Sequence, residues 1–499
     1  SNEMLSTNAN AYNNVWKLVK DGAVVQEGVL DADVAPMSNE DITVPFTRPE
    51  NIKPEDEYFL EISAQLKKDT AWAKAGYEVA SEQIAVDFGA EGDMPTIDAS
   101  QMANFKAVND TDAALQVEGE NFSLTFDKTA GTITNYTVNG KTVMTEGPMP
   151  KYSRGQISNG NGNSITAKMS ASNVQVDRQD KVITVSFDGT AGAARIKMTY
   201  IIFPSGDVQI KHTMTTSTSD LTQVGMGMKL AKDYENVQYY GRGPLDNYVD
   251  RNFSSNVGIY NSTVEDMFFD KFVKPQDSGM RSDVRWAALT DDNGDGVMFS
   301  SETPMYFGAS HYTSASLSTR HLYQCEKSED VVLNIASKQR GIGNASCGPG
   351  PLGKYTFGNG TFTQVYRITP INAQTDKMTE SKKIVTVDPL LDITVNGQSV
   401  GGFNADVTEY NYPILKNTVK DVPVVDVIKT NDGAAVEITQ ADSMNGTATI
   451  VATSGFGVQK TYRINFSESE QVYVSDMAWT TDVPGYFPNR RDIRPDGGG

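Results

Sequence analysis

Cysteine and histidine are scarce in this sequence of 499 residues, which has two cysteines and three histidines. A structural zinc site needs three or four Cys, His or carboxylate ligands at short spacing, and no CxxC motif is present to supply them. We therefore expect no metal site and no cofactor in this chain. Cys325 and Cys347 either form a disulfide in an oxidising compartment or remain two buried thiols, and we favour the thiols.

Positive charge and long apolar runs are also in short supply. Lys and Arg number 43 against 63 Asp and Glu, so the formal net charge is −20. A phosphate backbone or an anionic membrane face would repel such a chain, which argues against a nucleic-acid partner. No apolar run approaches the ~18 residues of a membrane span, and the opening SNEMLSTNAN lacks the regions of a signal peptide. It also lacks an initiator Met, so we expect a cleavage scar followed by the interior of a longer protein.

The rhythm of a βαβ unit is absent, which excludes a Rossmann domain and a (β/α)₈ barrel. Period-two alternation of apolar residues is present instead. It predicts a β-meander over 120–143, where an Asn-Gly pair marks a turn, and a hairpin over 194–216 around PSGD. Residues 67–88 contain alanines that favour a helix, but their glycine and valines favour strands, which we predict. We therefore expect an all-β protein.

The length of 499 residues suits about three or four domains, and changes in composition indicate their boundaries. A polar stretch around 93–113 separates two strand-rich units, and a further unit opens at VDPLLDITVNG and closes near TYRINF. The residues after that are too few to close a β-sandwich, so we expect a tail or the truncated start of another module. The predicted boundaries are 1–92, 93–113, 114–376, 377–468 and 469–499.

One acidic stretch matches a calcium-loop pattern. Residues 291–302, DDNGDGVMFSSE, fit D-x-[DN]-x-[DN]-G-x₅-E in full. An EF-hand needs flanking helices, whereas the residues on both sides of this stretch alternate like strands. We therefore predict that DNGDG is a hairpin turn, and leave weak calcium binding open.

The sequence assigns no catalytic residue. There is no nucleophile elbow, and paired carboxylates for sugar chemistry meet in space rather than in sequence. His212 lies in an alternating stretch and is expected to be a packed strand residue, while His311 and His321 flank a polar loop and remain weak candidates for a base. The Gly-rich run 341–353 is followed by strand rather than helix, so it predicts an ordered loop and not a phosphate cradle.

A long stretch carries a family resemblance. QYYGRGPLDNYVDRNFSSNVGIY, followed by FVKPQDSGMRSDVRWAALTDDNGDG, resembles the large carboxyl-terminal β domain of family 2 β-galactosidases. VEGENFSLTFDKTAGTI resembles the start of that domain, and WKLVKDGAVVQEGVL resembles the Ig-like domain before it. The resemblance implies an Ig-like sandwich over 1–92 and a galactose-mutarotase-like β-supersandwich over 114–376. LLDITVNGQSVGGFNADVTEYNYPI resembles an Ig/cadherin-like module of secreted bacterial glycosidases, here 377–468.

The stretch YYGRGPLDNYVDR also has a physical interpretation. Two glycines permit a sharp corner, a proline stiffens it, and charged side chains hold it through charge-assisted hydrogen bonds above two packed tyrosines, Tyr240 and Tyr248. We expect a structural corner and not a catalytic loop. Its residues are Gly241, Arg242, Gly243, Pro244, Asp246, Asp250 and Arg251.

In the family that the sequence resembles, one loop of the β domain reaches the active site with a stacking aromatic in a G-[IVL]-G-G-D-x-S-W pattern. Here GIGNASCG places Cys347 and Gly348 where the Ser and Trp would be, so the stacking ring is missing. KYSRGQISNGNG corresponds to a second family strip but has lost its acidic pair. The resemblance leaves these candidates for carbohydrate binding: Arg154, Asn159, Asn344, Ser346, Cys347 and Tyr355.

In the resembled family, the catalytic glutamates and metal ligands of a retaining glycosidase lie in a barrel domain, which would precede residue 1. We therefore expect the non-catalytic carboxyl-terminal part of such an enzyme, with its own barrel domain as partner and a β-linked galactoside or related glycan as ligand. One alternative is a stand-alone carbohydrate-binding β-sandwich protein using Tyr312, Tyr355 or Trp479. Another is epimerase chemistry, which needs a histidine with an acidic partner. Tandem β modules favour a periplasmic, cell-surface or secreted location.

Overall fold

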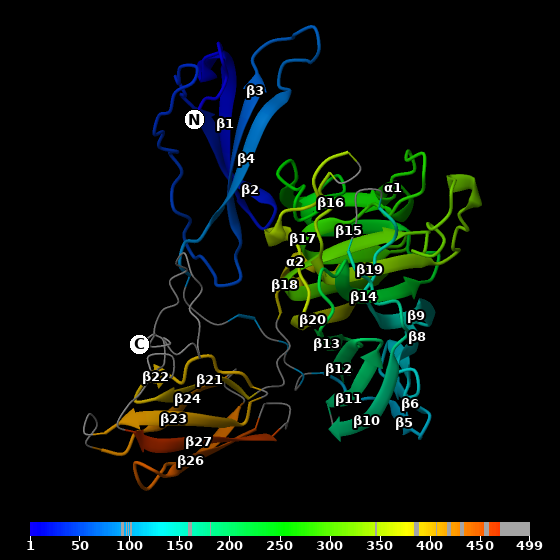
Figure 1. The fold of residues 1–499 in the computed structure, drawn as a ribbon, viewed down its shortest axis with the longest axis vertical. Coiled ribbons are helices and arrows are strands. Elements are labelled where there is room, and N and C mark those ends of the chain that lie inside the picture. Colours follow the sequence, from blue (N-terminus) through cyan, green and yellow to red (C-terminus); the bar gives the residue numbers. More distant parts are fainter. Residues whose placement is uncertain are drawn as a thin grey trace, which may run out of the picture. The chain divides into compact units, whose positions relative to one another are not determined.

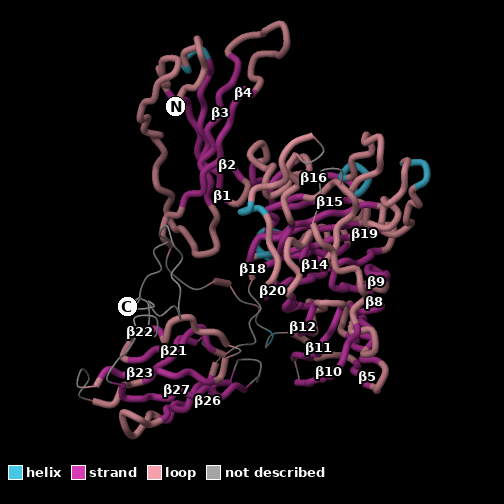
Figure 2. Tube along the Cα trace, viewed as in Figure 1, coloured by secondary structure: helices cyan, strands magenta, loops and turns pink. Residues whose placement is uncertain are grey.

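The computed structural model describes residues 1–90, 94–95, 97, 99, 102–157, 162–179, 181–344, 347–383, 389–405, 407–416, 421–429, 434–453 and 459–469. The chain forms two compact units, one of residues 1–97 and 102–384 and one of residues 98–101 and 385–499. Strands dominate both units, and the few helices are short (Figures 1 and 2). The all-β prediction is therefore confirmed. Among the residues described, no helix is long and apolar enough to cross a membrane.

The first unit begins with a four-stranded antiparallel sheet in the order β2-β1-β3-β4. Its elements are the short 3₁₀ helix η1 (Ala9–Ala11), β1 (Tyr12–Lys20), β2 (Ala23–Leu30), β3 (Tyr58–Leu66) and β4 (Glu78–Val86). Period-two alternation places Trp16, Leu18 and Leu60 on one face, where they pack against the segment between β2 and β3 through Val44 and Phe46. In the stretch 67–88, the predicted strand is present as β4, and the residues before it form a loop.

The rest of the first unit is one 16-stranded sheet. Its strands in chain order are β5 (Ala107–Asp110), β6 (Ala114–Glu118), β7 (Phe122–Asp127), β8 (Thr132–Val138), β9 (Lys141–Lys151), β10 (Ser170–Gln179), β11 (Val182–Ala191), β12 (Ala194–Ile202), β13 (Val208–Thr216), β14 (Gln223–Leu230), β15 (Asn236–Gly243), β16 (Asn256–Thr263), β17 (Arg281–Thr290), β18 (Gly296–Ser310), β19 (Val331–Gln339) and β20 (Gly360–Ile371). Its short helices are α1 (Val264–Met267), η3 (Leu322–Gln324), η4 (Gly353–Tyr355) and α2 (Lys377–Ser381).

The topology of the large sheet follows the turns that the sequence marks. β7, β8 and β9 form the predicted meander, and β12 and β13 form the predicted hairpin, with Ile202 opposite Val208. Because alternate residues point inward along each strand, the strands enclose one extended core with Phe126, Tyr200 and Phe307 among its fully buried side chains. β15, β16 and β17 branch from the main path through the β17–β18 pair. This branch carries the stretch YYGRGPLDNYVDR.

The acidic stretch that matches a calcium loop is the turn between β17 and β18. Thr290 pairs with Gly296 across it, so the hairpin prediction is confirmed. The Asp291 carboxylate accepts the backbone N–H groups of Asn293 and Asp295 at 2.9 and 3.1 Å. The Lys141 ammonium lies 2.7 Å from the same carboxylate and 3.5 Å from that of Asp295. A lysine from β9 therefore supplies the positive charge that an acidic turn attracts.

The second unit is a β-sandwich. One sheet has the order β22-β21-β24 and the other the order β23-β27-β26-β25, in which β23 and β27 are parallel. The two sheets share one core that includes Ile393, Ile450 and Tyr462. Its strands are β21 (Leu390–Val395), β22 (Gln398–Ser399), β23 (Glu409–Leu415), β24 (Val425–Lys429), β25 (Ala435–Thr439), β26 (Thr447–Thr453) and β27 (Gln459–Ser469).

Candidate functional site

Four loops of the large sheet are tied together by hydrogen bonds, and we call them the loop cluster: residues 152–157, 244–255, 268–280 and 340–355, of which 345 and 346 lie outside the described residues. The Arg154 guanidinium donates to the Arg340 carbonyl at 2.6 Å, which joins the first loop to the last. The Gly155 N–H donates to the Asp277 carboxylate at 2.9 Å, which joins the first loop to the third. The cluster therefore brings together stretches that are far apart in the sequence.

Asp250 links the second loop to the fourth. Its carboxylate accepts the backbone N–H groups of Ile342 and Gly343 at 3.1 and 2.8 Å. A Cβ at Gly341 would lie only 2.6 Å from an oxygen of this carboxylate, so a larger residue there would displace the Asp250 side chain. Gly343 has a φ of +56°, which other residues rarely adopt. The Gly-rich run therefore folds around the Asp250 carboxylate. Asp250 was expected to stabilise its own corner, and it also holds this second loop.

Arg154 lies inside the cluster and not on its surface. Its side chain is buried, and burial lowers the pKa of its guanidinium, with Tyr248 and Asp277 nearby to oppose the shift. Its second terminal nitrogen, Nη2, has no hydrogen-bond partner among the described residues. The Tyr248 ring is buried too, and burial raises the pKa of its hydroxyl. The interior of the cluster is therefore polar and closely packed.

The glycines of the YYGRGPLDNYVDR stretch have a different role from the one expected. Gly241 and Gly243 lie in β15, paired with Gly258 and Asn256 of β16, and neither has a positive φ. A Cβ on Gly241 would lie 2.8 Å from the Val284 Cα, and one on Gly243 would meet the Tyr260 ring at 2.7 Å. These glycines permit close packing of neighbouring strands in the sheet. The chain leaves the strand only at Pro244, after a cis Gly243-Pro244 peptide.

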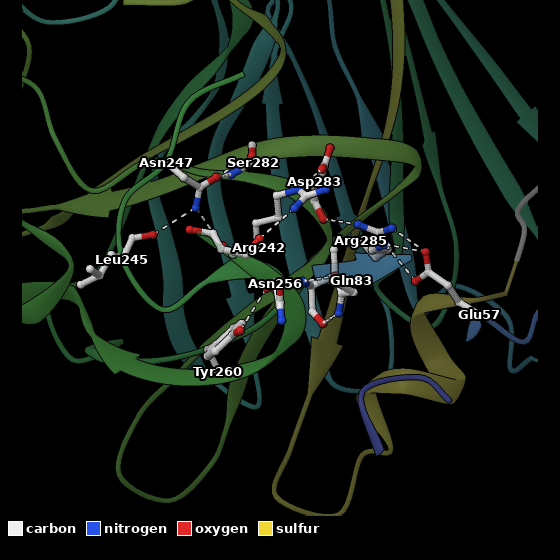
Figure 3. A network of polar contacts seen from close by, with 12 residues as sticks. Glu57, Gln83, Arg242, Leu245, Asn247, Asn256, Tyr260, Ser282, Asp283 and Arg285 are labelled. Atoms are coloured by element: carbon white, nitrogen blue, oxygen red, sulfur yellow. Dashed lines mark hydrogen bonds and ion pairs between the residues drawn. The ribbon is translucent and has the colours of Figure 1, made fainter. Parts of the chain in front are cut away.

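A buried asparagine, which the sequence reasoning missed, holds the corner. The Asn247 side-chain amide donates to the Arg242 and Leu245 carbonyls at 3.0 Å each, and its oxygen accepts the Ser282 N–H at 2.9 Å and the Ser282 hydroxyl at 2.5 Å (Figure 3). Only 1% of Asn247 is exposed. The sequence signal that could have indicated this role is an Asn that directly follows turn-forming residues, since such a residue, if buried, needs hydrogen-bond partners.

The predicted charged residues of the corner are used unequally. Arg242 forms an ion pair with Asp283 at 2.5 Å and donates to the Ser255 carbonyl at 2.8 Å. Arg251 is exposed and lies over the Tyr248 ring at 6.0 Å, and Asp246 is exposed. Tyr240 and Tyr248 are both buried. Of the four charged residues, Arg242 and Asp250 therefore make the hydrogen bonds that fix the chain.

The remaining candidates for carbohydrate binding lie in the fourth loop. Asn344 and Cys347 are exposed and are joined by a backbone hydrogen bond of 3.0 Å, and Tyr355 is half-buried with the Lys354 ammonium 4.8 Å from its ring centroid. Asn159 and Ser346 lie outside the described residues, as does Trp479. Carbohydrate binding by these residues stays a prediction.

The two cysteines are free, with Cys325 half-buried and Cys347 exposed. The expectation of two buried thiols is therefore wrong for Cys347, which lies in the surface loop of the cluster. Among the described residues, no group of three or more His, Cys, Asp and Glu is placed to hold a metal ion.

None of the three histidines lies in the loop cluster. His212 is fully buried in β13, and its Nε2 lies 2.8 Å from the Tyr152 hydroxyl. His311 contacts the Glu235 carboxylate at 2.5 Å through Nε2 and the Ser328 carbonyl at 3.2 Å through Nδ1. His321 stacks on the Tyr323 ring at 5.3 Å. His212 thus has a phenol as its partner, and His311 has both ring nitrogens engaged.

The loop cluster also displays apolar side chains to solvent, which the sequence reasoning missed. Val273 is 92% exposed and Phe253 is 85% exposed. Phe269 and Phe272 contact each other, with ring centroids 4.8 Å apart, and exposed apolar patches mark interaction sites. The exposed large apolar side chains of the cluster are Leu245, Phe253, Phe269, Phe272, Val273 and Leu352.

The four-stranded sheet is fixed to the large sheet next to the corner (Figure 3). Glu57 receives a forked ion pair from Arg285, with N–O distances of 2.5 to 3.2 Å, and the Tyr240 hydroxyl at 2.7 Å. The Gln83 amide bonds both the N–H and the carbonyl of Val257 at 2.8 and 2.9 Å. Val19 and Phe59 pack in one small core with Trp286 and Met298. The first unit therefore holds its two sheets together by matched polar and apolar contacts.

Comparison with known families matches two ranges of the chain. Residues 118–368 match the model of the beta galactosidase small chain, and residues 1–87 match that of beta-galactosidase domain 4. The chain is 28% identical over 391 residues to a β-galactosidase of Priestia megaterium, covering 74% of this chain and 37% of that protein. It is 29% identical over 365 residues to one of Halalkalibacterium halodurans, covering 68% of this chain and 35% of that protein. The chain thus spans little more than a third of these relatives.

Among solved structures, a putative aldose 1-epimerase from Escherichia coli K12 aligns with 52% of this chain and 98% of its own, at 9% identity and a TM-score of 0.31. A galactose 1-epimerase from Lactobacillus acidophilus NCFM aligns with 54% of this chain and 98% of its own, at 9% identity and a TM-score of 0.32. This likeness concerns the fold alone.

Proposed function

Because this chain belongs to the β-galactosidase family, through its small-chain and domain 4 regions, we propose that it is the non-catalytic carboxyl-terminal part of a β-galactosidase-type glycoside hydrolase. In this proposal the catalytic acids lie in a barrel domain carried elsewhere, and the loop cluster helps to shape the pocket of that barrel. The ligand of the whole enzyme is a β-linked galactoside or a related glycan.

The observation that carries the proposal is the loop cluster itself. Its loops are held in place by interior contacts such as the Asp250 carboxylate on two backbone N–H groups, while its apolar side chains remain exposed. A surface that is ordered before it is covered is suited to contact with another domain.

The acidic residues of the cluster are used in its structure. Asp250 and Asp277 both accept backbone N–H groups from other loops of the cluster. A retaining glycosidase needs a pair of carboxyl groups about 5–5.5 Å apart that are free to act as acid and nucleophile. Carboxylates that serve as loop anchors fit a supporting role better than that one.

The test compares three samples on nitrophenyl β-galactoside. This chain alone is expected to give no turnover above a buffer blank, and the part of the Priestia megaterium relative outside the matched region is expected to give none either. A chimera that joins that part to this chain is expected to hydrolyse the substrate. Turnover by this chain alone would refute the non-catalytic role, and an inactive chimera whose two parts are folded would refute the support of a barrel.

Within the chimera, Asp250→Asn tests the loop cluster. An amide can keep only part of the paired acceptance of two N–H groups and offers no negative charge to them. We expect KM for the galactoside to rise, because the fourth loop would lose its anchor. The melting temperature should change little. Asp246→Asn, an exposed neighbour in the same corner, is the matched control and should leave KM unchanged.

We also place the parent enzyme in the periplasm, at the cell surface or outside the cell. The β-sandwich of the second unit supports this, because tandem β modules are typical of such locations, and the net charge of −20 is compatible with it. Fractionation of cells that express the full parent protein with an epitope tag would place it, and recovery in the cytoplasm alone would contradict the proposal.

A further inference from the structure

Two exposed aromatic rings lie together at the tip of the β3–β4 hairpin. Trp72 is 65% exposed and Tyr77 is 54% exposed, and their ring centroids are 5.3 Å apart at an interplanar angle of 83°. Leaving an indole in water forgoes the stabilisation that burial of such a large apolar side chain gives. We call residues 67–77 the aromatic tip.

The aromatic tip is an ordered loop that is held by its own hydrogen bonds. The Thr70 N–H donates to the Ala73 carbonyl at 2.8 Å, and the Gly76 N–H to the Leu66 carbonyl at 2.8 Å. The Asp69 carboxylate accepts the Ala75 N–H at 3.0 Å and the Lys74 ammonium at 2.7 Å. These bonds fix the backbone on both sides of Trp72 without burying its ring. The ring is therefore presented in a defined place before any ligand arrives, which lowers the entropic cost of binding.

The surroundings of the two rings are polar and charged. Asp69 and Lys74 are both largely exposed, and the Lys74 bond and the Ala75 N–H lower the pKa of Asp69, so its carboxylate is ionised at neutral pH. An aromatic face together with a carboxylate and an ammonium group in one loop suits a ligand with one apolar face and many hydroxyl groups. The core of a protein interface is depleted of Lys and Asp, and this loop carries both.

We propose that the aromatic tip is a carbohydrate-binding site, separate from the loop cluster, that takes a terminal galactosyl residue. The axial 4-hydroxyl of galactose leaves the C–H groups at positions 3, 4 and 5 together on one face of the sugar. The negative face of an indole attracts these polarised C–H groups. Asp69 and Lys74, which lie in the same loop, are the polar side chains that would meet the sugar hydroxyls. The choice of galactose rests on the proposed function, whereas the stacking itself rests on the tip.

Saturation-transfer NMR on the whole chain, with lactose as the probe, tests the proposal. Signals are expected on the galactosyl C–H protons, and the Trp72→Ala and Tyr77→Phe variants are used to locate the site. Trp72→Ala should raise the dissociation constant at least about tenfold, while Tyr77→Phe keeps the ring and should leave it nearly unchanged. Tyr323→Ala, which removes an 84% exposed ring from another loop, is the matched control and should leave binding unchanged.

The comparison probe is cellobiose, which ends in glucose. Stronger transfer to lactose than to cellobiose supports the choice of galactose, and equal transfer would overturn that choice. No transfer to either sugar, or transfer that persists in Trp72→Ala, would overturn the site. Concentration-dependent association of the chain in sedimentation, abolished by Trp72→Ala, would overturn it in favour of a contact between copies. None of these readouts needs hydrolysis, so the site and the supporting role of the chain can fail independently.

Discussion

At the scale of single residues, buried polar side chains fix the conformation of the corner more than exposed charged ones do. Asn247 and Asp246 lie next to each other in the corner, but the first makes four hydrogen bonds in the interior and the second faces solvent. A ranking of the two residues by charge alone would put Asp246 first. The number of partners a side chain satisfies is therefore the better guide to its role.

Asn247→Ala should destabilise the first unit by about 2–4 kcal/mol, because two carbonyls and a buried Ser282 N–H lose their partner. The unfolding midpoint in urea, followed by tryptophan fluorescence, measures the change. Asp246→Ala at the exposed neighbour should stay within about 0.5 kcal/mol of the unmodified chain. Equal effects of the two substitutions would show that Asn247 does not hold the corner.

His212 should make stability depend on pH. Burial lowers its pKa from the ordinary 6.5 to about 4, so between these values the unfolded chain binds a proton that the folded chain does not. Stability contributed by the neutral imidazole is present above about pH 6.5 and is lost as the pH falls toward 4, by up to about 3 kcal/mol. His212→Gln should flatten this part of the curve of unfolding free energy against pH. An unchanged slope would mean that the pKa of His212 is not lowered in the folded chain.

At the scale of elements, the glycines of β15 show how closely its neighbours approach. A Cβ at Gly241 would meet both the side chain and the Cα of Val284, and a backbone atom cannot move away as a side chain can. Gly241→Ala should therefore cost about 3 kcal/mol of unfolding free energy. Gly350→Ala is the control, since a Cβ there meets nothing within 4 Å. A small effect at Gly241 would mean that β15 and β17 can separate without loss.

The elements themselves could be predicted because their signals are local. Period-two alternation and Asn-Gly turns gave the meander, and the acidic turn at DNGDG was recognised from the strands on either side of it. The partners of Asp250 could not be predicted, because the N–H groups it accepts lie 92 and 93 residues along the chain. The role of Asn247 could not be predicted from the motif either, because its partner Ser282 is 35 residues away. The local pattern fixes a strand, and only the packed fold selects the partners of its loops.

At the scale of the whole molecule, the two sheets of the first unit should behave as one body. The Glu57–Arg285 pair is shielded on the Tyr240 side and is less than a third exposed at Arg285, so solvent screens it only in part. A double-mutant cycle with Glu57→Gln and Arg285→Met should give a coupling of about 1–2 kcal/mol in urea unfolding. The exposed Asp69–Lys74 pair, taken through the same kind of cycle, should give a coupling near zero. Similar couplings for both pairs would argue against a fixed junction.

The amide of Gln83 has a consequence beyond joining two sheets. Among the described strands β16 pairs with β15 alone, so its other side carries backbone groups that a strand of another chain could pair with. The Gln83 side chain accepts the N–H and donates to the carbonyl of Val257, as the backbone of a neighbouring strand would. It therefore occupies the pairing groups of this one residue. At Val257, therefore, no strand from another chain can pair with β16 unless it first displaces Gln83.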